Sequence, residues 1–484
     1  MRLLNILCLA FCSFMTLGAS FEVVTSQKAP EEGVFDVHLR SIRQDGRHPE
    51  VQTVFEQVRA WKDLSKGHPL LSQGDQEVHD ETMSMLWDWN HVLSVKLNND
   101  TDTIDLVPTT GLSDMMLMHK NCTRCWSMHG TKWNPEFHLP AGGTDAKLKK
   151  KKLEYFYMMH LYDVEVEGFY WAVSACLATG GPNSCANDIV LYAVQSAKPW
   201  FYTLGDGFFG LAETPGYSGS EETSLISQLH SQGMLKKKIF SVHTHMFNTT
   251  SDPSQVRFGG INEALFKEGH EVLSMKTSSK QSWEVKFDSA GFRTSKIWNG
   301  HHALIEPGYP FIALPKEAFD IFKSDLLAAY PDEPVTCSDD EWCYFLTHCD
   351  KLVKSMPSLQ FTFPTEHQEL GFVTFKVPPE SFLFNDKDYK TKLDTCHLGV
   401  VRQRFSALDH FILGSAFMEN FYVVFDASDE NFNRVGLSYN VRAALDEKKP
   451  ASNNLISIFA ITTAVALLLV FAVVVICNRN RRRQ

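Results

Sequence analysis

The chain has 484 residues, 44% of them hydrophobic, and 46 Lys and Arg against 57 Asp and Glu give it a formal net charge of −11. A chain of this length is long enough to fold as two units with sizeable cores. The acidic balance excludes nucleic acid as the main partner, because binding to a phosphate backbone needs a positively charged surface.

The first twenty residues have the layout of a secretory signal peptide. Arg2 precedes an apolar run over residues 3–17, and small residues follow at 18–20. This order of basic, apolar and small residues is typical of a cleaved targeting segment. We therefore assign residues 1–20 to a signal peptide and expect the mature chain to start near Phe21.

Residues 21–88 are less regular. Residues 34–43 alternate between apolar and polar side chains as a strand does, whereas residues 50–64 have helical spacing. We interpret 21–88 as a prosegment-like region. It is either removed from the mature protein or kept as part of the fold.

Two stretches share one pattern, an apolar run that enters a tight turn ending in glycine and a second apolar run that leaves it. Residues 106–117 have this turn at Thr109-Thr110-Gly111, and residues 303–314 have it at Glu306-Pro307-Gly308. Such a pattern predicts a strand, a turn and another strand. Each copy is followed further along the chain by two apolar residues and a glycine, Phe208-Phe209-Gly210 and Ile412-Leu413-Gly414. The duplication predicts two homologous lobes.

Further short motifs follow one another in a fixed order between Trp89 and Asn440. They are Trp133-Asn134-Pro135, Asp206-Gly207-Phe208-Phe209-Gly210, Phe258-Gly259-Gly260, Trp283-Glu284-Val285 and Arg434-Val435-Gly436. In this order the chain resembles the pepsin-like aspartic peptidases, with a layout similar to the membrane-tethered β-secretases. The resemblance implies an all-β, bilobal pepsin-like acid-protease fold with a central cleft, an N-terminal β lobe at 89–250 and a C-terminal β lobe at 251–440.

The resemblance places Thr109 and Glu306 where this family has its two catalytic aspartates. The peptidase mechanism needs two carboxylates about 3 Å apart that share one proton. Thr109 has no group that titrates in this range, and Glu306 is longer than aspartate by a methylene, which displaces its carboxylate. The sequence therefore predicts an inactive member of the family, a pseudopeptidase.

Residues beside these two positions are candidates for lining the cleft, namely Thr110, Gly111, Gly308 and Tyr309. Active relatives close over substrate with a hairpin that carries Tyr-Gly-x-Gly. Tyr155 and Tyr157 are candidates for that tyrosine, but their segment lacks the glycines. A hairpin without its turn glycines is expected to be shorter or differently bent.

Two pairs of cysteines lie close together in the first lobe. Cys122 and Cys125 form either a disulfide or, with flanking histidines, part of a zinc site. The missing second ligand pair and the oxidising compartment favour the disulfide. Cys176 and Cys185 bracket a turn and are a second candidate pair. We predict no metal site and no cofactor.

Four cysteines lie in the second lobe, and on their own they permit three pairings. Cys349 with Cys396 resembles the second-lobe disulfide of the family. This resemblance leaves Cys337 to pair with Cys343.

Three asparagines lie in glycosylation sequons, Asn99, Asn121 and Asn248. A sequon is an acceptor for N-linked glycan when it faces the secretory lumen. We expect the protein to be a glycoprotein.

An uncharged apolar stretch runs from Leu455 to Cys477 and is long enough to span a bilayer. Arginines follow at once, and positive charge on that flank places the tail, residues 478–484, in the cytoplasm. A lipid-anchor signal is the alternative, although such signals end in apolar residues. We expect a single-pass type I membrane protein at the cell surface or in a secretory or endosomal lumen, with residues 441–454 as the juxtamembrane linker.

Three functions remain open on the sequence alone. The first is a membrane-anchored pseudopeptidase that binds a peptide or protein ligand in the cleft without cutting it. The second is a divergent aspartic-type endopeptidase that uses Glu306 with a nearby carboxylate such as Asp105 or Asp114. The third is a cell-surface adhesion protein in which the fold only displays a surface.

Overall fold

The structure is a computed structural model. It describes residues 35–38, 40–41, 91–97, 103–127, 132, 149–157, 160–177, 185–213, 224–244, 254–280, 282–293, 295–338, 342–366, 370–387, 394–403, 410–429 and 431–440. The predicted signal peptide, the apolar stretch 455–477, the tail, Asn99 and Asn248 lie outside these residues. Within the described part of the chain, no helix is both long and apolar enough to cross a membrane.

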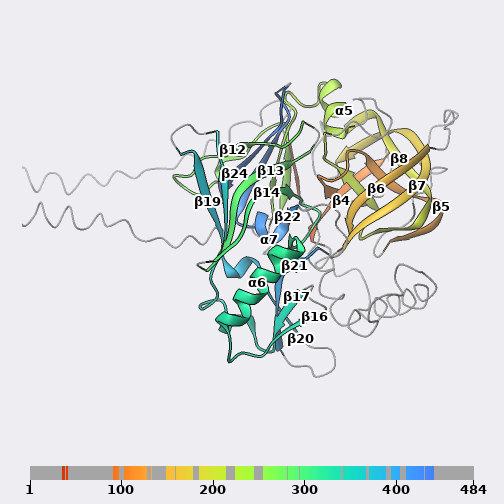
Figure 1. The fold of residues 1–484 in the computed structure, drawn as a ribbon. Helices are drawn as coiled ribbons and strands as arrows, with labels where there is room; N and C mark the ends of the chain where they lie inside the picture. Colours follow the sequence, from red (N-terminus) through yellow and green to blue (C-terminus); the bar gives the residue numbers. More distant parts are fainter. Residues whose placement is uncertain are drawn as a thin grey trace, which may run out of the picture.

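Strands make up most of the described chain, in agreement with the predicted all-β class (Figure 1). The α-helices among the described residues are α5 (Leu225–Ser231), α6 (Lys316–Ala329) and α7 (Ser415–Met418), of 7, 14 and 4 residues. The strand β18 (Leu359–Pro364) shows why these segments are strands, since its buried and half-buried residues alternate one by one. Such a period of two places every second side chain in the core.

An N-terminal sheet of eight strands has the order β2-β3-β4-β9-β5-β8-β7-β6. Its strands are β2 (Arg40–Ser41), β3 (His91–Leu97), β4 (Ile104–Thr109), β5 (Met115–Ser127), β6 (Lys149–Tyr157), β7 (His160–Leu177), β8 (Cys185–Thr203) and β9 (Gly207–Gly210). Figure 1 shows this sheet on the right, in orange and yellow.

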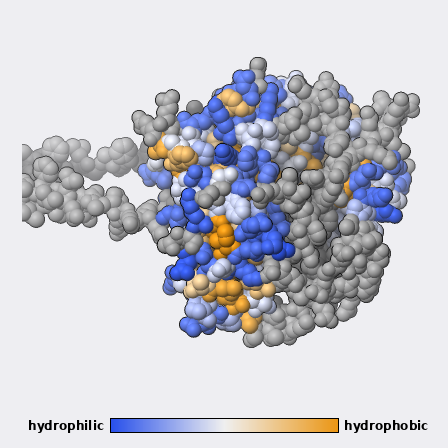
Figure 2. All heavy atoms as spheres, in the orientation of Figure 1, coloured by the Kyte–Doolittle hydropathy of each residue, from blue (hydrophilic) through white to orange (hydrophobic). Residues whose placement is uncertain are grey.

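A C-terminal sheet of ten strands has the order β16-β17-β21-β15-β22-β14-β13-β18-β19, with β20 paired to β21. Besides β18, its strands are β13 (Glu284–Phe292), β14 (Ser295–Ile305), β15 (Ile312–Leu314), β16 (Val335–Ser338), β17 (Trp342–Phe345), β19 (Phe372–Val377), β20 (Leu383–Lys387), β21 (Asp394–Arg402) and β22 (Phe411–Leu413). The helix α6 contacts this sheet at β14, β15 and β21, and its outer face leaves Ile321 and Leu327 exposed. Hydrophilic residues dominate the described surface on the face drawn in Figure 2, with smaller hydrophobic areas between them.

A bridging sheet of six strands joins the two halves, in the order β1-β11-β10-β23-β24-β12. Its strands are β1 (Phe35–His38), β10 (Ile239–His243), β11 (Gln255–Phe258), β12 (Leu273–Lys276), β23 (Phe421–Asp426) and β24 (Arg434–Tyr439). Strand β1, which lies in the region 21–88, is one of the two edge strands of this sheet and pairs with β11. The predicted lobe boundary at 250/251 falls between β10 and β11 and stays a prediction.

The two copies of the turn pattern occupy equivalent places in their sheets. In the first copy β4 enters the turn and pairs in parallel with β9, while β5 leaves it and pairs antiparallel with β9. In the second copy β14 pairs in parallel with β22, and β15 pairs antiparallel with β22. The same pairing in both sheets confirms the internal repeat predicted from the sequence.

Glycine is required at the ends of the two supporting strands, Gly210 at the end of β9 and Gly414 directly after β22. A Cβ atom on Gly210 would lie 2.5 Å from the carbonyl oxygen of Asp114, and one on Gly414 would lie 2.1 Å from that of Tyr309. Any side chain would therefore push the turn away from the strand that supports it.

Trp283 ties the bridging sheet to both halves. Its indole N–H donates to the carbonyl oxygen of Leu211, 2.8 Å away. Its fully buried ring packs edge to face against Phe240 and Phe425, with centroids 5.5 and 5.2 Å apart. Burial of an aromatic ring with a paired N–H is strongly stabilising.

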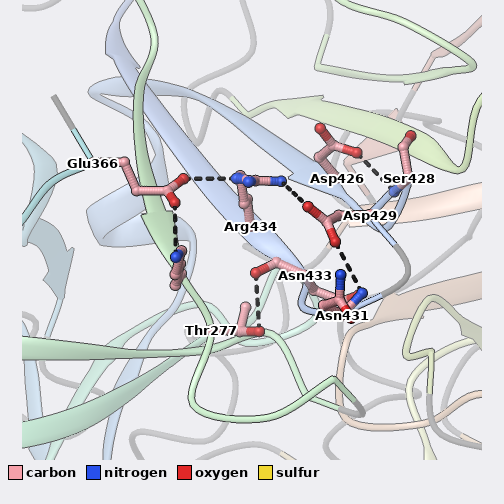
Figure 3. Close-up of polar contacts among 9 residues, drawn as sticks. Thr277, Glu366, Asp426, Ser428, Asp429, Asn431, Asn433 and Arg434 are labelled. Carbon is pink, nitrogen blue, oxygen red and sulfur yellow. Dashed lines mark hydrogen bonds and ion pairs between the residues drawn. The ribbon is translucent and has the colours of Figure 1, made fainter.

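A charged network holds the edge of the bridging sheet (Figure 3). Arg434 donates to Glu366 at 2.6 Å and to Asp429 at 3.3 Å, and its guanidinium lies 4.2 Å from the ring centroid of Phe432. Lys276 lies against the same ring, also at 4.2 Å. Glu366 follows β18, so the network joins the C-terminal and bridging sheets.

Four disulfides join the cysteine pairs named from the sequence, Cys122–Cys125, Cys176–Cys185, Cys337–Cys343 and Cys349–Cys396. The first bond uses both thiols of the Cys-x2-Cys motif, which leaves no thiolate there to bind zinc. Cys349–Cys396 closes the longest loop of the four, so it restricts the unfolded chain most.

Candidate active-site loops

The two turns contact each other. The backbone N–H of Glu306 donates to the carbonyl oxygen of Leu413 at 3.1 Å, which fixes the second turn to β22. The backbone N–H of Leu211 donates to the carbonyl oxygen of Thr109 at 2.8 Å, which fixes the first turn to the end of β9 in the same way. Between the turns, a Cβ atom on Gly308 would lie 2.4 Å from the carbonyl oxygen of Pro108. The two backbones are therefore in direct contact.

The Glu306 side chain crosses from its own turn to the other one. Its Oε2 accepts from the Thr109 hydroxyl at 2.9 Å, from the Gly111 N–H at 3.0 Å and from the Thr110 N–H at 3.1 Å. Its Oε1 accepts from the N–H of Gly308 at 2.8 Å. The extra methylene of glutamate provides this reach. Glu306 is 1% exposed, so these groups replace water as its hydrogen-bond partners.

The Thr110 hydroxyl makes a second link between the turns. It donates to the carbonyl oxygen of Ile305 at 2.6 Å, and it also lies 3.1 Å from Oε2 of Glu306. A hydroxyl has one hydrogen, so it donates to only one of these acceptors at a time. The shorter distance assigns it to Ile305. This leaves a lone pair of the Thr110 oxygen toward Glu306, ready to accept a hydrogen bond when that carboxyl is protonated.

Two opposing effects set the pKa of Glu306. Burial raises it, because a desolvated carboxylate is costly, whereas the hydrogen bonds from Gly308, Thr109 and Thr110 lower it. Burial prevails and the pKa rises to about 6 from an ordinary 4.5. The carboxyl is therefore mostly ionised at neutral pH and gains a proton in mild acid.

Comparison with known proteins shows the family of this chain. A model of the eukaryotic aspartyl protease family matches residues 95–439. The chain belongs to this family. The match confirms the pepsin-like family predicted from the motifs.

Several curated relatives are similar at low identity. Gastricsin of Macaca fuscata fuscata is 26% identical over 243 residues, which are 49% of this chain and 56% of that protein. Pepsin A of Gallus gallus is 24% identical over 253 residues, 51% of this chain and 60% of that protein. Pepsin A of Sus scrofa is 25% identical over 242 residues, which are 49% of this chain and 55% of that protein. The chain thus spans a little over half the length of the curated relatives it matches.

The two aspartates considered as partners for Glu306 lie elsewhere. Asp105 accepts from the Ser94 hydroxyl at 2.8 Å, and its backbone N–H donates to Asp206. Asp114 is buried beside Tyr170 and Tyr192, where burial and then the charge of Asp114 raise the pKa of both phenols. Within the described residues, every group that hydrogen-bonds to the Glu306 carboxylate is a hydroxyl or a backbone amide.

The remaining cleft candidates take different positions. Gly111 and Gly308 both donate to Glu306. Tyr309 is 1% exposed, and its ring packs edge to face against Phe311 with centroids 6.0 Å apart. Tyr309 is therefore part of the core.

The predicted flap segment forms a hairpin of β6 and β7. Tyr157 pairs with His160, so two residues connect the strands, and the pairing continues back to Lys149 opposite Gly168. Tyr155 pairs with Tyr162. The hairpin forms over the full length of β6 although the turn glycines are missing.

The sequence did not reveal the amides of Thr110 and Gly111 as partners of Glu306. The signal present in the sequence was the length of the side chain at 306. A glutamate at a turn where aspartate is expected places its carboxylate about one bond farther from the backbone. Because this turn faces the equivalent turn of the repeat, the extra bond brings the carboxylate closer to that other turn.

Proposed function

We propose that this protein is a membrane-anchored pseudopeptidase, which binds a peptide or protein ligand and does not cleave it. The single observation that carries the proposal is the contact between the Thr109 hydroxyl and the Glu306 carboxylate. On the family pattern these are the positions of the two catalytic carboxylates, and the chain has one carboxylate there.

The chemistry of that contact opposes peptide hydrolysis. An aspartic peptidase uses one carboxylate as a base toward water while its partner holds the proton. Here Oε2 of Glu306 already accepts from Thr109 and from two backbone amides, and Oε1 accepts from Gly308. A carboxylate occupied in this way joins the two turns and has little capacity left to activate water.

Binding without cleavage remains open to the same scaffold. Peptides bind to β proteins in extended form through backbone hydrogen bonds, which need no catalytic group. The repeat, the hairpin of β6 and β7 and the bridging sheet are all formed. The predicted anchor at 455–477 would hold such a binding protein at a membrane surface, and the four disulfides fit an oxidising compartment.

The competing function is a divergent endopeptidase. Family membership and the mildly acidic titration of Glu306 favour it. It requires a second proton-holding group beside Glu306, and the group found there is the hydroxyl of Thr109.

Incubation of the detergent-solubilised full chain with a mixed peptide library, from about pH 3 to 7 where carboxylates titrate, tests the proposal. We expect no turnover, together with retention of a subset of peptides by the folded protein. Turnover that disappears in Glu306→Gln would establish the endopeptidase instead. Alkaline extraction of membranes, with protease protection of the C-terminal tail, tests the anchor separately.

A further inference from the structure

Two exposed hydrophobic side chains lie close together at one hairpin of the C-terminal sheet. Among the large hydrophobic residues of the described chain, Phe372 and Leu370 are the most exposed, at 58% and 48%. Phe372 begins β19 and pairs with Pro364, the last residue of β18, so both side chains lie at the tip of the β18–β19 hairpin. Figure 2 shows a hydrophobic area at the upper left, where Figure 1 draws this end of β19.

The strand itself lies at the edge of the C-terminal sheet. Along β19, Phe372, Thr374 and Lys376 are exposed, whereas Phe375 and Val377 are buried. Since side chains alternate between the two faces of a strand, Phe372 belongs to the outer face by its position. Its exposure is therefore a regular feature of the strand. An apolar group in such a place marks a surface that contacts something other than water.

The tip of the hairpin is held against the bridging sheet. The N–H of Glu366 donates to the carbonyl oxygen of Ser274 on β12 at 3.0 Å. The Glu366 carboxylate accepts from Arg434 at 2.6 Å and lies 3.4 Å from Lys276 Nζ (Figure 3). Glu366 is the acidic residue among the described residues of the hairpin, and two cations lie beside it. Its charge therefore offers little resistance to an apolar partner at the tip.

The last described strand runs beside the same hairpin. The hydroxyl of Tyr439, the last residue of β24, accepts from the N–H of Lys376 at 3.1 Å. Its ring lies 5.8 Å from that of Phe375. Phe372 precedes Lys376 by four residues on β19, which is about 13 Å along the strand. The end of β24 and the tip of the hairpin are thus little more than a strand length apart.

The chain beyond β24 is short before the apolar stretch begins. Residues 441–454 lie between the last described residue, Asn440, and the apolar stretch that starts at Leu455. Fully extended, this segment reaches at most about 50 Å. It is long enough to place Leu455 beside Phe372, and it keeps the folded part of the chain close to whatever surface holds the stretch.

We propose that the β18–β19 hairpin rests on the membrane, with Leu370 and Phe372 in the interfacial layer of the bilayer. The inference rests on the membrane anchor of the proposed function. Two apolar side chains bind a bilayer only weakly. An anchor removes that difficulty, because it keeps the hairpin at a high effective concentration next to the lipid. The contact would fix which face of the C-terminal sheet turns toward the membrane.

Apolar contact, and not charge, holds the hairpin in this arrangement. A type I topology places the folded part of the chain on the lumenal side, whereas the anionic lipids that attract lysine and arginine gather in the cytoplasmic leaflet. The formal net charge of −11 adds no attraction to anionic lipid. The occupant of the patch is therefore neutral phospholipid.

Tryptophan fluorescence of the full chain, reconstituted into phosphatidylcholine vesicles with brominated acyl chains, tests the contact. Phe372→Trp places a tryptophan at the exposed tip, and the unaltered chain supplies the background of the native tryptophans. The emission that this variant adds should be mostly lost to quenching by bromine. Leu346→Trp is the matched control, because Leu346 is 44% exposed and follows β17, near the opposite edge of the same sheet. Its added emission should be unchanged.

Flotation of the vesicles, measured first, separates the anchor from the hairpin. Protein that does not float with the vesicles would overturn the anchor and the hairpin contact together. If the protein floats, quenching of the added tryptophan of Phe372→Trp by iodide in the water would overturn the hairpin contact alone. Protection from both quenchers would mean that protein covers the tip, for example a second copy of this chain, and would overturn it as well.

A phospholipid with a photoreactive acyl chain gives an independent answer without any substitution. Illumination of the unaltered chain in such vesicles should attach lipid to the peptide that contains Leu370 and Phe372 and leave the peptide around Leu346 unmodified. Mass spectrometry of the digested protein identifies both peptides. Lipid found on the stretch 455–477 but not at the hairpin would contradict the proposed contact.

Discussion

The hydroxyl of Thr109 lies 2.9 Å from Oε2 of Glu306, and both groups are buried where the two turns of an internal repeat meet. Gly111 adds an N–H that reaches both oxygen atoms, at 3.1 Å from Thr109 Oγ1 and 3.0 Å from Oε2. The hydroxyl thus accepts from one turn and donates to a side chain of the other.

Replacement of Thr109 by alanine should lower the free energy of unfolding by about 2 kcal/mol, because a buried carboxylate loses a hydroxyl donor. Thr109→Ser keeps the donor and should recover most of that loss. Urea unfolding of both variants at neutral pH measures the difference. Equal stability of the two variants would show that the hydroxyl does not support Glu306.

The Glu306 carboxyl should give the protein a characteristic pH dependence. Its pKa is about 6 in the folded protein and close to the ordinary 4.5 in the unfolded chain. The folded state therefore binds the proton more tightly, so its stability is highest below pH 4.5 and falls as the pH rises through 6. The fall amounts to about 2 kcal/mol.

This dependence is measured as the difference in unfolding free energy between the unaltered chain and Glu306→Gln across that pH range. The glutamine variant has no titrating group at 306, so the other carboxylates cancel in the comparison. A constant difference at all pH values would contradict the assignment of the raised pKa to Glu306.

The close approach of the two turns makes one glycine irreplaceable. A Cβ atom on Gly308 would lie 2.4 Å from the carbonyl oxygen of Pro108, so Gly308→Ala must push the turns apart. We expect a loss of about 2 kcal/mol from this overpacking.

Gly111→Ala is the matched control for that substitution. Its Cβ atom would contact only side-chain atoms, Thr109 Oγ1 at 3.4 Å and Glu306 Oε2 at 3.5 Å. It should change stability by less than about 1 kcal/mol. Thermal unfolding of the two alanine variants, side by side, decides whether the backbone contact between turns exists.

The position of this site could be predicted from the sequence, whereas its internal arrangement could not. The repeat was visible because Thr109-Thr110-Gly111 and Glu306-Pro307-Gly308 both follow an apolar run and both precede one. The direction of the Glu306 side chain depends on how closely Pro108 and Gly308 approach, and that distance results from packing between segments far apart in the chain.

The same limit applies to the contact of Glu284 with two histidines and to Tyr309. Glu284, His302 and His410 form no motif, and only the register of β13, β14 and β22 brings them together. Tyr309 follows Gly308 directly and was therefore expected in the cleft. Its ring instead packs against Phe311, because aromatic burial in the core outweighs a position beside the turn.

The Arg434 network should contribute modestly to stability. Arg434 is partly exposed, so its ion pairs with Glu366 and Asp429 are screened by solvent. We expect Arg434→Lys to lower the free energy of unfolding by at most about 1 kcal/mol, through loss of the planar contact with Phe432 and of one of the two pairs. Lys316→Met, which removes the solvent-exposed pair with Asp320, is the control and should have no measurable effect. A larger loss of unfolding free energy in the lysine variant would mean that the bridging sheet depends on this network for its stability.

Introduction of an aspartate at 109 tests the central arrangement most directly. In Thr109→Asp a second buried carboxylate would lie beside Glu306, and two such groups cannot both be ionised at this distance. At neutral pH we expect the variant to lose about 3 kcal/mol or more, since one charge would lack a partner. The loss should shrink as the pH falls, because one shared proton removes the repulsion. Thr109→Asn has nearly the same shape without the charge, so its stability should follow the pH dependence of the unaltered chain. If the aspartate and asparagine variants behave alike from neutral to acid pH, Thr109 does not face Glu306, and the case for a pseudopeptidase loses its structural basis.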